Sequence, residues 1–167
     1  ETTAVALAWT FYLLAGHPEA LAAVHAELDA VLAGRLPTAD DLPRLVHTRR
    51  ALQEAMRLYP PAHTFGRSVL REYTLGPYTI PAGRSMVFIC PYLLHRDERY
   101  FPAPLEFRPE RWTPAFEAGL PRFAYVPFGG GARVCIGAAF AWMEGTLVLA
   151  TLLRRWTIAL APGAKVR

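Results

Sequence analysis

The sequence predicts a mainly α-helical protein with a minor β part. Three helical patterns fill the first third of the chain and a fourth follows Cys135, whereas β patterns are short runs confined to residues 65–90. Sheets limited to small hairpins place the chain in this class. With 167 residues, of which 53% are hydrophobic and 19% charged, the chain can form one globular unit with a sizeable core, and a disordered tail or linker is excluded.

Two helices are expected at the start of the chain. Residues 2–15 carry apolar side chains at nearly every position, which favours a central helix buried over most of its circumference. Gly16 and Pro18 end that helix, because glycine suits a helix C-terminus and proline cannot continue it. Residues 18–33 place their apolar side chains on one stripe, which is typical of an amphipathic helix at the periphery.

A short turn and a third helix follow. Thr38 and Asp41 have the spacing of a capping box, which predicts a turn of helix beginning there. A further helix is expected over residues 44–58. Pro60 and Pro61 end it, since proline interrupts helical hydrogen bonding.

The second half of the chain has a different character. Turns rich in glycine and proline separate four short β runs, which predict a small meandering sheet. These runs are residues 65–70, 73–75, 78–80 and 85–90. Residues 97–127 then contain six prolines interleaved with aromatic side chains, which indicates a compact wrapped coil because the aromatic side chains require burial. A last helix is expected from just after Cys135 to about Trp156.

Charge and hydropathy exclude two kinds of partner. The formal net charge of +4 comes from 17 arginines and one lysine that are scattered without a basic run, so nucleic-acid binding is not expected. This modest positive charge suits an acidic protein partner or an anionic ligand. The longest apolar stretch, residues 4–15, is shorter than the roughly 20 residues of a membrane helix, so no membrane segment is expected in this chain.

The number of cysteines predicts the redox environment of the protein, and the first residue bears on whether the sequence is part of a longer protein. Cys90 and Cys135 are too few for a disulfide framework or a structural zinc site, so a reducing, cytoplasmic setting is the expectation. Cys90 itself is interpreted as a small buried strand residue without a ligand role. The sequence opens on Glu1 directly into a helical pattern without a capping residue, from which we expect it to be part of a longer protein.

The segment FGGGARVCIG, from Phe128 to Gly137, is the most informative part of the chain. Its three consecutive glycines let the backbone lie close to a flat ligand or adopt positive φ. Cys135 lies just before a helix, whose unpaired N–H groups and dipole favour the thiolate form of a cysteine. Shielded by Phe128 and balanced by Arg133, such a thiolate is a candidate axial ligand for heme iron. The alternative is a structural cysteine beside a glycine-rich turn.

This segment resembles the heme-binding loop of the cytochrome P450 superfamily. The family pattern FxxGxRxCxG is matched at all five fixed positions, by Phe128, Gly131, Arg133, Cys135 and Gly137. The resemblance implies that Cys135 is the axial ligand of the iron in heme b (iron protoporphyrin IX), with the other four residues around the cofactor. The chain is most similar to bacterial members of the family.

Two further motifs resemble the family's structural network. Glu54 and Arg57 form an ExxR pattern, and residues 109–112 read PERW, like the family's PERF motif with Trp112 in place of the usual phenylalanine. The resemblance implies that Arg111 completes a network with Glu54 and Arg57 that locks the coil against a helix. Such a role is structural, since a buried carboxylate held by two guanidinium groups is costly to break.

The resemblance also assigns residues near the expected heme. Arg67 and Arg133 match positions that pair with heme propionates, for which the planar fork of arginine is well suited. His63 and Phe65 match the substrate side, although core packing explains them equally well. Glu1 and Thr2 resemble the acid and the alcohol of the family's oxygen-activation motif, where a hydroxyl backed by a carboxylate relays protons.

The resemblance covers essentially the whole chain. It implies that residues 1–167 are the C-terminal, heme-binding part of a longer P450 catalytic domain, built from a central-helix remnant, later helices, a small sheet, a proline-rich meander, the cysteine loop and the following helix. It implies a monooxygenase that acts on a small organic substrate and O2 and takes electrons from NAD(P)H through a ferredoxin or flavoprotein reductase. The alternatives are a heme-thiolate peroxygenase or isomerase and an inactive truncated remnant, and we expect the 167 residues alone to be inactive.

Two further sets of residues were weighed for a role. The histidines of the chain lack the spacing of a metal site, and the one in the sequence His-Arg-Asp is interpreted as part of a structural turn. They include His17, His25, His47 and His95. Four arginines could add to a basic surface for an electron donor, although scattered charges are usually only solvated. They are Arg49, Arg50, Arg122 and Arg133.

Overall fold

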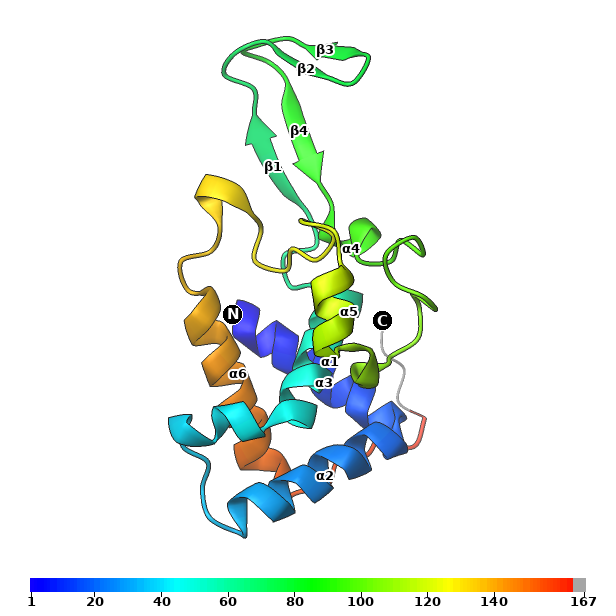
Figure 1. Ribbon diagram of the computed structural model, residues 1–167, viewed down its shortest axis with the longest axis vertical. Helices are drawn as coiled ribbons and strands as arrows, with labels where there is room; N and C mark the ends of the chain where they lie inside the picture. The colour runs from blue at the N-terminus through cyan, green and yellow to red at the C-terminus, as the bar shows by residue number, and fades with distance from the viewer. Residues whose placement is uncertain (164–167) are drawn as a thin grey trace.

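The computed structural model describes residues 1–163, which form a helical body with a β extension at one end (Figure 1). The long helices of the body are α1 (Thr2–Gly16), α2 (Pro18–Leu32), α3 (Val46–Leu58) and α6 (Ala138–Leu153). Helix α3 packs against the other three and is the element around which the core forms. The predicted fold class, mainly α with a minor β part, is confirmed.

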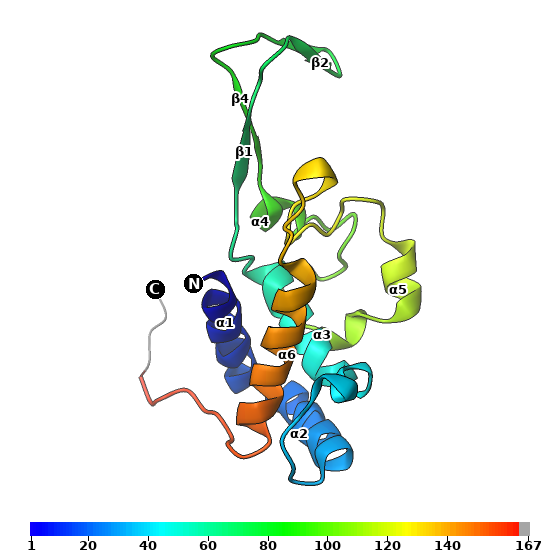
Figure 2. The same cartoon turned by 90° about the vertical axis from the view of Figure 1, so that its left-hand side faces the viewer.

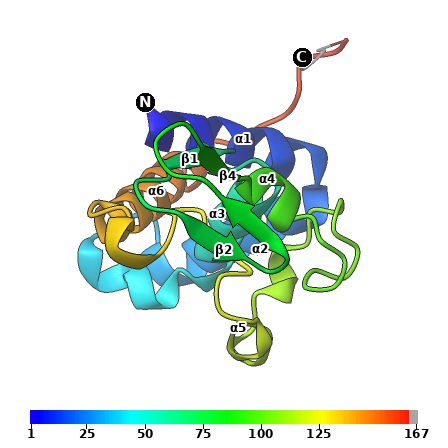
Figure 3. The ribbon, with the colours of Figure 1, turned by 90° about the horizontal axis from the view of Figure 1, so that it is seen from above.

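Helix α1 lies along one edge of the body (Figure 3). Its buried residues, Ala6, Thr10, Leu13 and Leu14, form one stripe with helical spacing. Val5, by contrast, is 38% exposed. The predicted burial over most of the circumference is therefore wrong for the described residues, because they supply packing partners on one side of α1 only.

The segment from α2 to α3 agrees well with its local sequence patterns. Helix α2 buries its apolar stripe and ends at Ala33, which adopts a left-handed conformation. The predicted capping box is confirmed, since Thr38 and Asp41 bond each other's backbone at the start of a 3-10 helix, η1 (Ala39–Arg44). Helix α3 begins two residues later than expected, because η1 takes up the chain as far as Arg44.

The β extension consists of two nested antiparallel pairs. Strand β1 (Phe65–Ser68) pairs with β4 (Met86–Ile89), and β2 (Tyr73–Leu75) pairs with β3 (Tyr78–Ile80). The predicted strands are confirmed, but the single meander is wrong, since the inner hairpin closes on itself and the outer strands pair around it. Figure 2 shows this extension rising well clear of the helices.

The proline-rich coil is compact, as expected. Three short helices interrupt it or adjoin it: α4 (Pro91–Leu94), η2 (Pro109–Arg111) and α5 (Pro114–Gly119). Its aromatic residues Phe101 and Trp112 are buried. A further 3-10 turn, η3 (Gly131–Arg133), precedes α6, which ends three residues before the predicted Trp156. None of the described helices is both long enough and apolar enough to cross a membrane.

Candidate heme site

A buried carboxylate on α3 organises the proximal coil. Glu54 and Arg57 lie one helical turn apart, and both side chains are fully buried. The guanidinium of Arg57 donates through Nε to Oε2 and through Nη2 to Oε1 of Glu54, each at 2.9 Å. This paired geometry is the strong form of a charge-assisted hydrogen bond. The ExxR pattern is therefore an internal ion pair and not a surface one.

Three further donors reach Glu54 from the PERW segment and the residue before it. Arg111 Nε donates to Oε1 at 2.9 Å, and the backbone N–H of Arg108 donates to the same oxygen at 3.0 Å. Trp112 Nε1 donates to Oε2 at 2.8 Å. The structure thus brings together Glu54, Arg57 and Arg111, the three residues of the expected network. Sequence reasoning missed Trp112, although an indole N–H in place of the usual phenylalanine was the available indication.

Arg57 also fastens the coil through its remaining N–H groups. Nη1 donates to the carbonyl oxygens of His95 at 2.8 Å and Pro104 at 2.7 Å. Nη2 donates to the carbonyl oxygen of Glu106 at 3.0 Å. Its guanidinium lies 5.3 Å from the ring centroid of Phe101, within the range of a cation–π contact. One arginine therefore joins α3 to three separate points of the coil.

His95 is fully buried where the coil meets the segment before the cysteine loop. Its Nε2 accepts a hydrogen bond from the backbone N–H of Val126 at 2.9 Å. Burial, followed by the positive charge of Arg57, lowers the pKa of His95 to about 3. The imidazole is therefore neutral near pH 7. The sequence predicts a structural turn at this residue, but it gives no indication of the bond to the loop.

The cysteine loop is shaped by its own backbone. Cys135 N–H donates to the carbonyl oxygen of Phe128 at 3.0 Å, which closes the loop. Gly129 and Gly131 have positive φ angles of 75° and 69°, which a residue with a side chain rarely adopts. Cys135 itself is an exposed free cysteine, three residues before α6 begins at Ala138.

Most of the predicted site residues line one cavity of about 450 Å³ between α1, α3, β1, the loop and α6. Those that line it are Thr2, Arg67, Phe128, Arg133, Cys135 and Gly137. Of the residues predicted to act in catalysis or to bind the cofactor, Glu1 and Gly131 do not line it, and neither do the network residues Glu54, Arg57 and Arg111. Phe65, at the start of β1, lines it as well, whereas His63 lines a separate pocket beside Cys90. The other walls are largely apolar, with Leu52, Met56 and Phe140 among them, and Glu144 on α6 adds one carboxylate.

The composition of this cavity fits a heme. Within residues 1–163 no three His, Cys, Asp or Glu side chains gather as metal ligands, so a metal at Cys135 has to bring its other ligands with it. A porphyrin does so. Its apolar face suits the apolar walls, and its two carboxylates suit the guanidinium groups of Arg67 and Arg133. A cavity of this size is ordinary for a cofactor site.

Two residues differ from their expected setting. Arg67 Nη1 donates to the carbonyl oxygen of Gly66 at 2.8 Å, so its guanidinium is partly engaged by its own strand. Cys90 lies at the N-terminal end of α4 and is partly exposed, so its interpretation as a buried strand residue is wrong. A hydrogen bond from Thr64 and nearby backbone N–H groups lower the pKa of Cys90.

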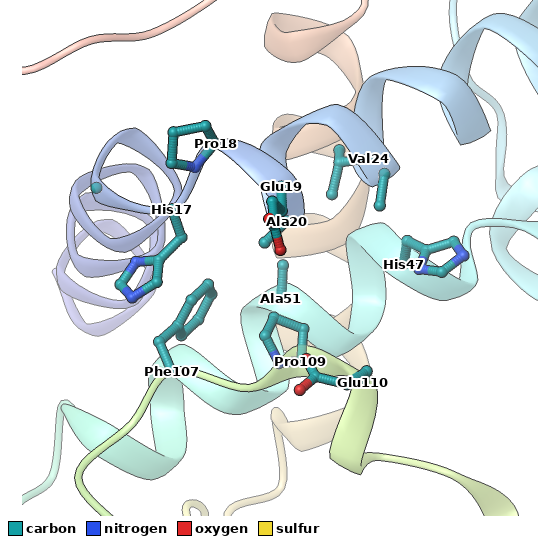
Figure 4. Close-up of a pocket in the computed structure, with 12 residues that line it drawn as sticks. His17, Pro18, Glu19, Ala20, Val24, His47, Ala51, Phe107, Pro109 and Glu110 are labelled. Atoms are coloured by element: carbon teal, nitrogen blue, oxygen red, sulfur yellow. The ribbon is translucent and has the colours of Figure 1, made fainter.

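A larger cavity of about 660 Å³ lies away from this site, between the α1–α2 junction, α3 and the coil. Figure 4 shows His17 and His47 at its opposite ends, with Glu19 and Glu110 between them. None of the site residues predicted from the sequence lines it. The residues that the sequence assigned to the heme therefore gather around Cys135 and not in this larger cavity.

The fold and the thiol-bearing loop together define the class of protein. A family model described as "Cytochrome P450" matches residues 1–167, and the chain belongs to that family. Membership of the family implies a heme cofactor.

Individual relatives agree with this assignment. Cyclooctatin synthase from Streptomyces melanosporofaciens is 48% identical over 167 residues, which are 100% of this chain and 36% of that protein. Pentalenene oxygenase from Streptomyces avermitilis is 42% identical over 167 residues, which are 100% of this chain and 37% of that protein. The crystal structure of a cytochrome P450 (CYP102L1) superposes with a TM-score of 0.91 at 31% identity, over 100% of this chain and 39% of that one. The chain spans little more than a third of the length of these proteins.

Proposed function

We propose that the protein is a heme-thiolate monooxygenase that inserts an oxygen atom from O2 into a small organic substrate. The observation that carries this proposal is the exposed thiol of Cys135 in an apolar cavity shared with Arg67, Arg133 and Thr2. Heme b, once bound, supplies the iron that activates O2 with electrons from NAD(P)H, delivered by a ferredoxin or flavoprotein donor. Residues 1–167 serve as the heme-binding part of a longer catalytic domain.

The loop residues have distinct roles in holding the heme. Cys135 would provide the thiolate ligand of the iron, and Phe128, which lines the same cavity, would shield it. Gly137, which lines the cavity, lets the loop lie close to the porphyrin because it carries no side chain, and Gly131 supplies a positive φ of 69° that shapes the loop.

Arginine pairing and proton transfer complete the proposal. Arg67 and Arg133 bind the two propionates, and Arg67 gives up its bond to Gly66 to do so. Thr2 lines the cavity, and its hydroxyl passes protons into it. Glu1, at the exposed end of α1, is the source of these protons. Glu54, Arg57 and Arg111 act at a distance, by fixing the coil against α3.

The substrate is proposed to be a cyclic compound of low polarity. The apolar walls formed by Pro61, Ala62 and Phe65 support this, because they offer no charged partner to a substrate. The names of bacterial relatives agree, since one is a pentalenene oxygenase and another, 44% identical over 163 residues, is a cyclooctat-9-en-7-ol 5-monooxygenase.

The test is the absorption spectrum of the reduced, CO-bound complete gene product. A thiolate opposite CO shifts the main heme band to longer wavelength, which a histidine ligand does not do. We expect the shifted band in the unaltered protein and in Cys90→Ser, the matched cysteine control, and its loss in Cys135→Ser. A shifted band that survives in Cys135→Ser would overturn the assignment of the ligand. Absence of heme from the unaltered protein would leave an inactive relative.

A further inference from the structure

We propose that His95 is a positioning residue, which ties the cysteine loop to the buried Glu54 network as a neutral imidazole with its proton on Nδ1. The proposal rests on the proposed function, since the loop matters for chemistry only if Cys135 binds heme iron. It goes beyond that function, because His95 lies outside the heme cavity and acts through other residues.

The first step is the link between His95 and the network. Its carbonyl oxygen accepts a hydrogen bond from Arg57 Nη1 at 2.8 Å, and the same guanidinium holds Glu54. All three side chains are fully buried. The backbone of His95 is thereby fixed to α3, the central helix of the body.

The second step is the link between His95 and the loop. Its Nε2 accepts the backbone N–H of Val126 at 2.9 Å. Val126 in turn accepts the N–H of Gly129 at 3.0 Å, and the carbonyl of Phe128 accepts the N–H of Cys135 at 3.0 Å. The imidazole therefore fixes the start of the turn to which Cys135 is hydrogen-bonded.

The third step concerns the tautomer. A ring nitrogen that accepts an N–H cannot itself carry a proton, so the proton of the neutral imidazole resides on Nδ1. An imidazolium has two donors and no acceptor. Protonation of Nε2 would therefore place its N–H against the N–H of Val126 and break the hydrogen bond between them. A buried N–H left without an acceptor is costly, and Nδ1 is already buried without a hydrogen-bond partner among the described residues, so protonation at Nε2 would leave further buried N–H groups unpaired. The bond to Val126 thus requires a neutral His95.

The surroundings of His95 maintain that state. Burial and the positive charges of Arg57 and Arg96 lower its pKa to about 3, while the backbone of Arg57 and Met56 acts in the opposite direction. On the remaining side the ring of Tyr125 packs at 4.9 Å between centroids. The acceptor function of Nε2 is therefore retained throughout the pH range in which the protein is handled.

The experiment compares two substitutions in the complete, heme-loaded gene product. His95→Gln retains an acceptor close to the position of Nε2, whereas His95→Leu removes it at similar volume. We expect His95→Leu to lose heme about 10- to 100-fold faster than the unaltered protein and to lose part of its thiolate-shifted CO band. We expect His95→Gln to remain close to the unaltered protein in both measurements. His25→Leu, on the remote helix α2, is the matched histidine control and should change neither.

A second measurement holds even if His95→Leu fails to fold. Imidazole nitrogen chemical shifts of the unaltered protein, labelled in its histidines, should include one ring that is a neutral Nδ1–H tautomer at pH 5 to 8 and that belongs to His95. His95→Gln identifies that ring by removing its signal. A charged ring or an Nε2–H tautomer would overturn the proposal, as would His95→Gln losing heme as fast as His95→Leu. If the proposed function is wrong, the unaltered protein shows no shifted CO band, and the tautomer measurement is unaffected.

Discussion

The indole Nε1–H of Trp112 donates a 2.8 Å hydrogen bond to Oε2 of Glu54, and both side chains are buried. Each carboxylate oxygen of Glu54 is thereby shared between α3 and the coil, since Oε1 accepts from Arg111 as well as Arg57. The position after the PERW arginine is thus part of the network in this protein and not only a packing residue.

Replacing this indole tests its contribution. Trp112→Phe keeps an aromatic ring but leaves Oε2 of Glu54 with one donor fewer. Hydrogen bonds to charged groups contribute about 1.5–3 kcal/mol, so we expect the free energy of unfolding in urea to fall by about that amount. Trp156→Phe, which alters an exposed tryptophan, should change it by less than about 0.5 kcal/mol. Equal effects of the two substitutions would show that the bond to Glu54 contributes nothing.

Removing Arg57 should have a larger effect. Arg57→Ala leaves Glu54 buried with fewer donors and frees the carbonyl oxygens of His95, Pro104 and Glu106. Breaking a buried ion pair costs about 3–5 kcal/mol, so we expect the complete gene product to retain no heme, as measured by absorbance after purification. Arg99→Ala breaks an exposed ion pair and should retain normal heme content. Normal heme content in Arg57→Ala would contradict the structural role of the network.

Helix α3 is capped by a residue of another helix, which gives a further prediction. Glu27 on α2 accepts the N–H of His47 at 2.6 Å and the N–H of Thr48 at 2.9 Å, where α3 has no cap of its own. We expect Glu27→Ala to lower the free energy of unfolding by about 0.5–2 kcal/mol, the usual effect of losing an N-cap. The exposed Asp29→Ala on the same helix is the control in the same urea titration. No difference between the two would show that the contact is not a cap.

Asp41 should make stability depend on acid pH. Hydrogen bonds from Arg35, Arg44 and Thr38 hold the pKa of its buried carboxyl well below the usual range. A lowered folded-state pKa stabilises the protein above the unfolded pKa of about 3.9, and this contribution is lost as pH falls below that value. We therefore expect the unaltered protein to lose more stability than Asp41→Asn between pH 6 and pH 2.5.

The control for this prediction is Asp40→Asn, which alters the exposed neighbour of Asp41. Its unfolding free energy should follow the pH profile of the unaltered protein. Added salt should weaken the effect, because Arg35 and Arg44 are 47% and 57% exposed. Parallel profiles for Asp41→Asn and the unaltered protein would refute the prediction.

Local sequence patterns predicted the positions of helices and strands well, but they predicted less well which of these elements pair or pack together. The capping box of Thr38 and Asp41 and the apolar stripe of α2 depend on neighbours in sequence, so the sequence was sufficient for both. The turns rich in glycine and proline located the strands β1 to β4 but could not distinguish a meander from nested hairpins, because pairing is not local. The apolar composition of α1 likewise carried no information about which of its sides meets a neighbour.

Site residues could be predicted from the sequence where the residue type itself indicates the chemistry. Cys135 and its glycines define a loop by composition, and the structure places most of the residues expected around it in one cavity. Trp112 and His95 were missed for a shared reason. Their roles arise from burial against Glu54 and Val126, residues distant in sequence, and no spacing rule marks such a contact.

The long reach of the Glu54 contacts sets an order of events during synthesis. Trp112 follows Glu54 by 58 residues, and a ribosome adds about 5–20 residues per second, so the glutamate is made roughly 3–12 seconds before its indole partner. During that delay the carboxylate has only Arg57 beside it, and burying α3 would leave a charge without its remaining donors. We therefore expect α3 to be buried only after the coil has emerged. Until then its apolar side chains, among them Leu52 and Leu58, are surfaces that a chaperone can hold.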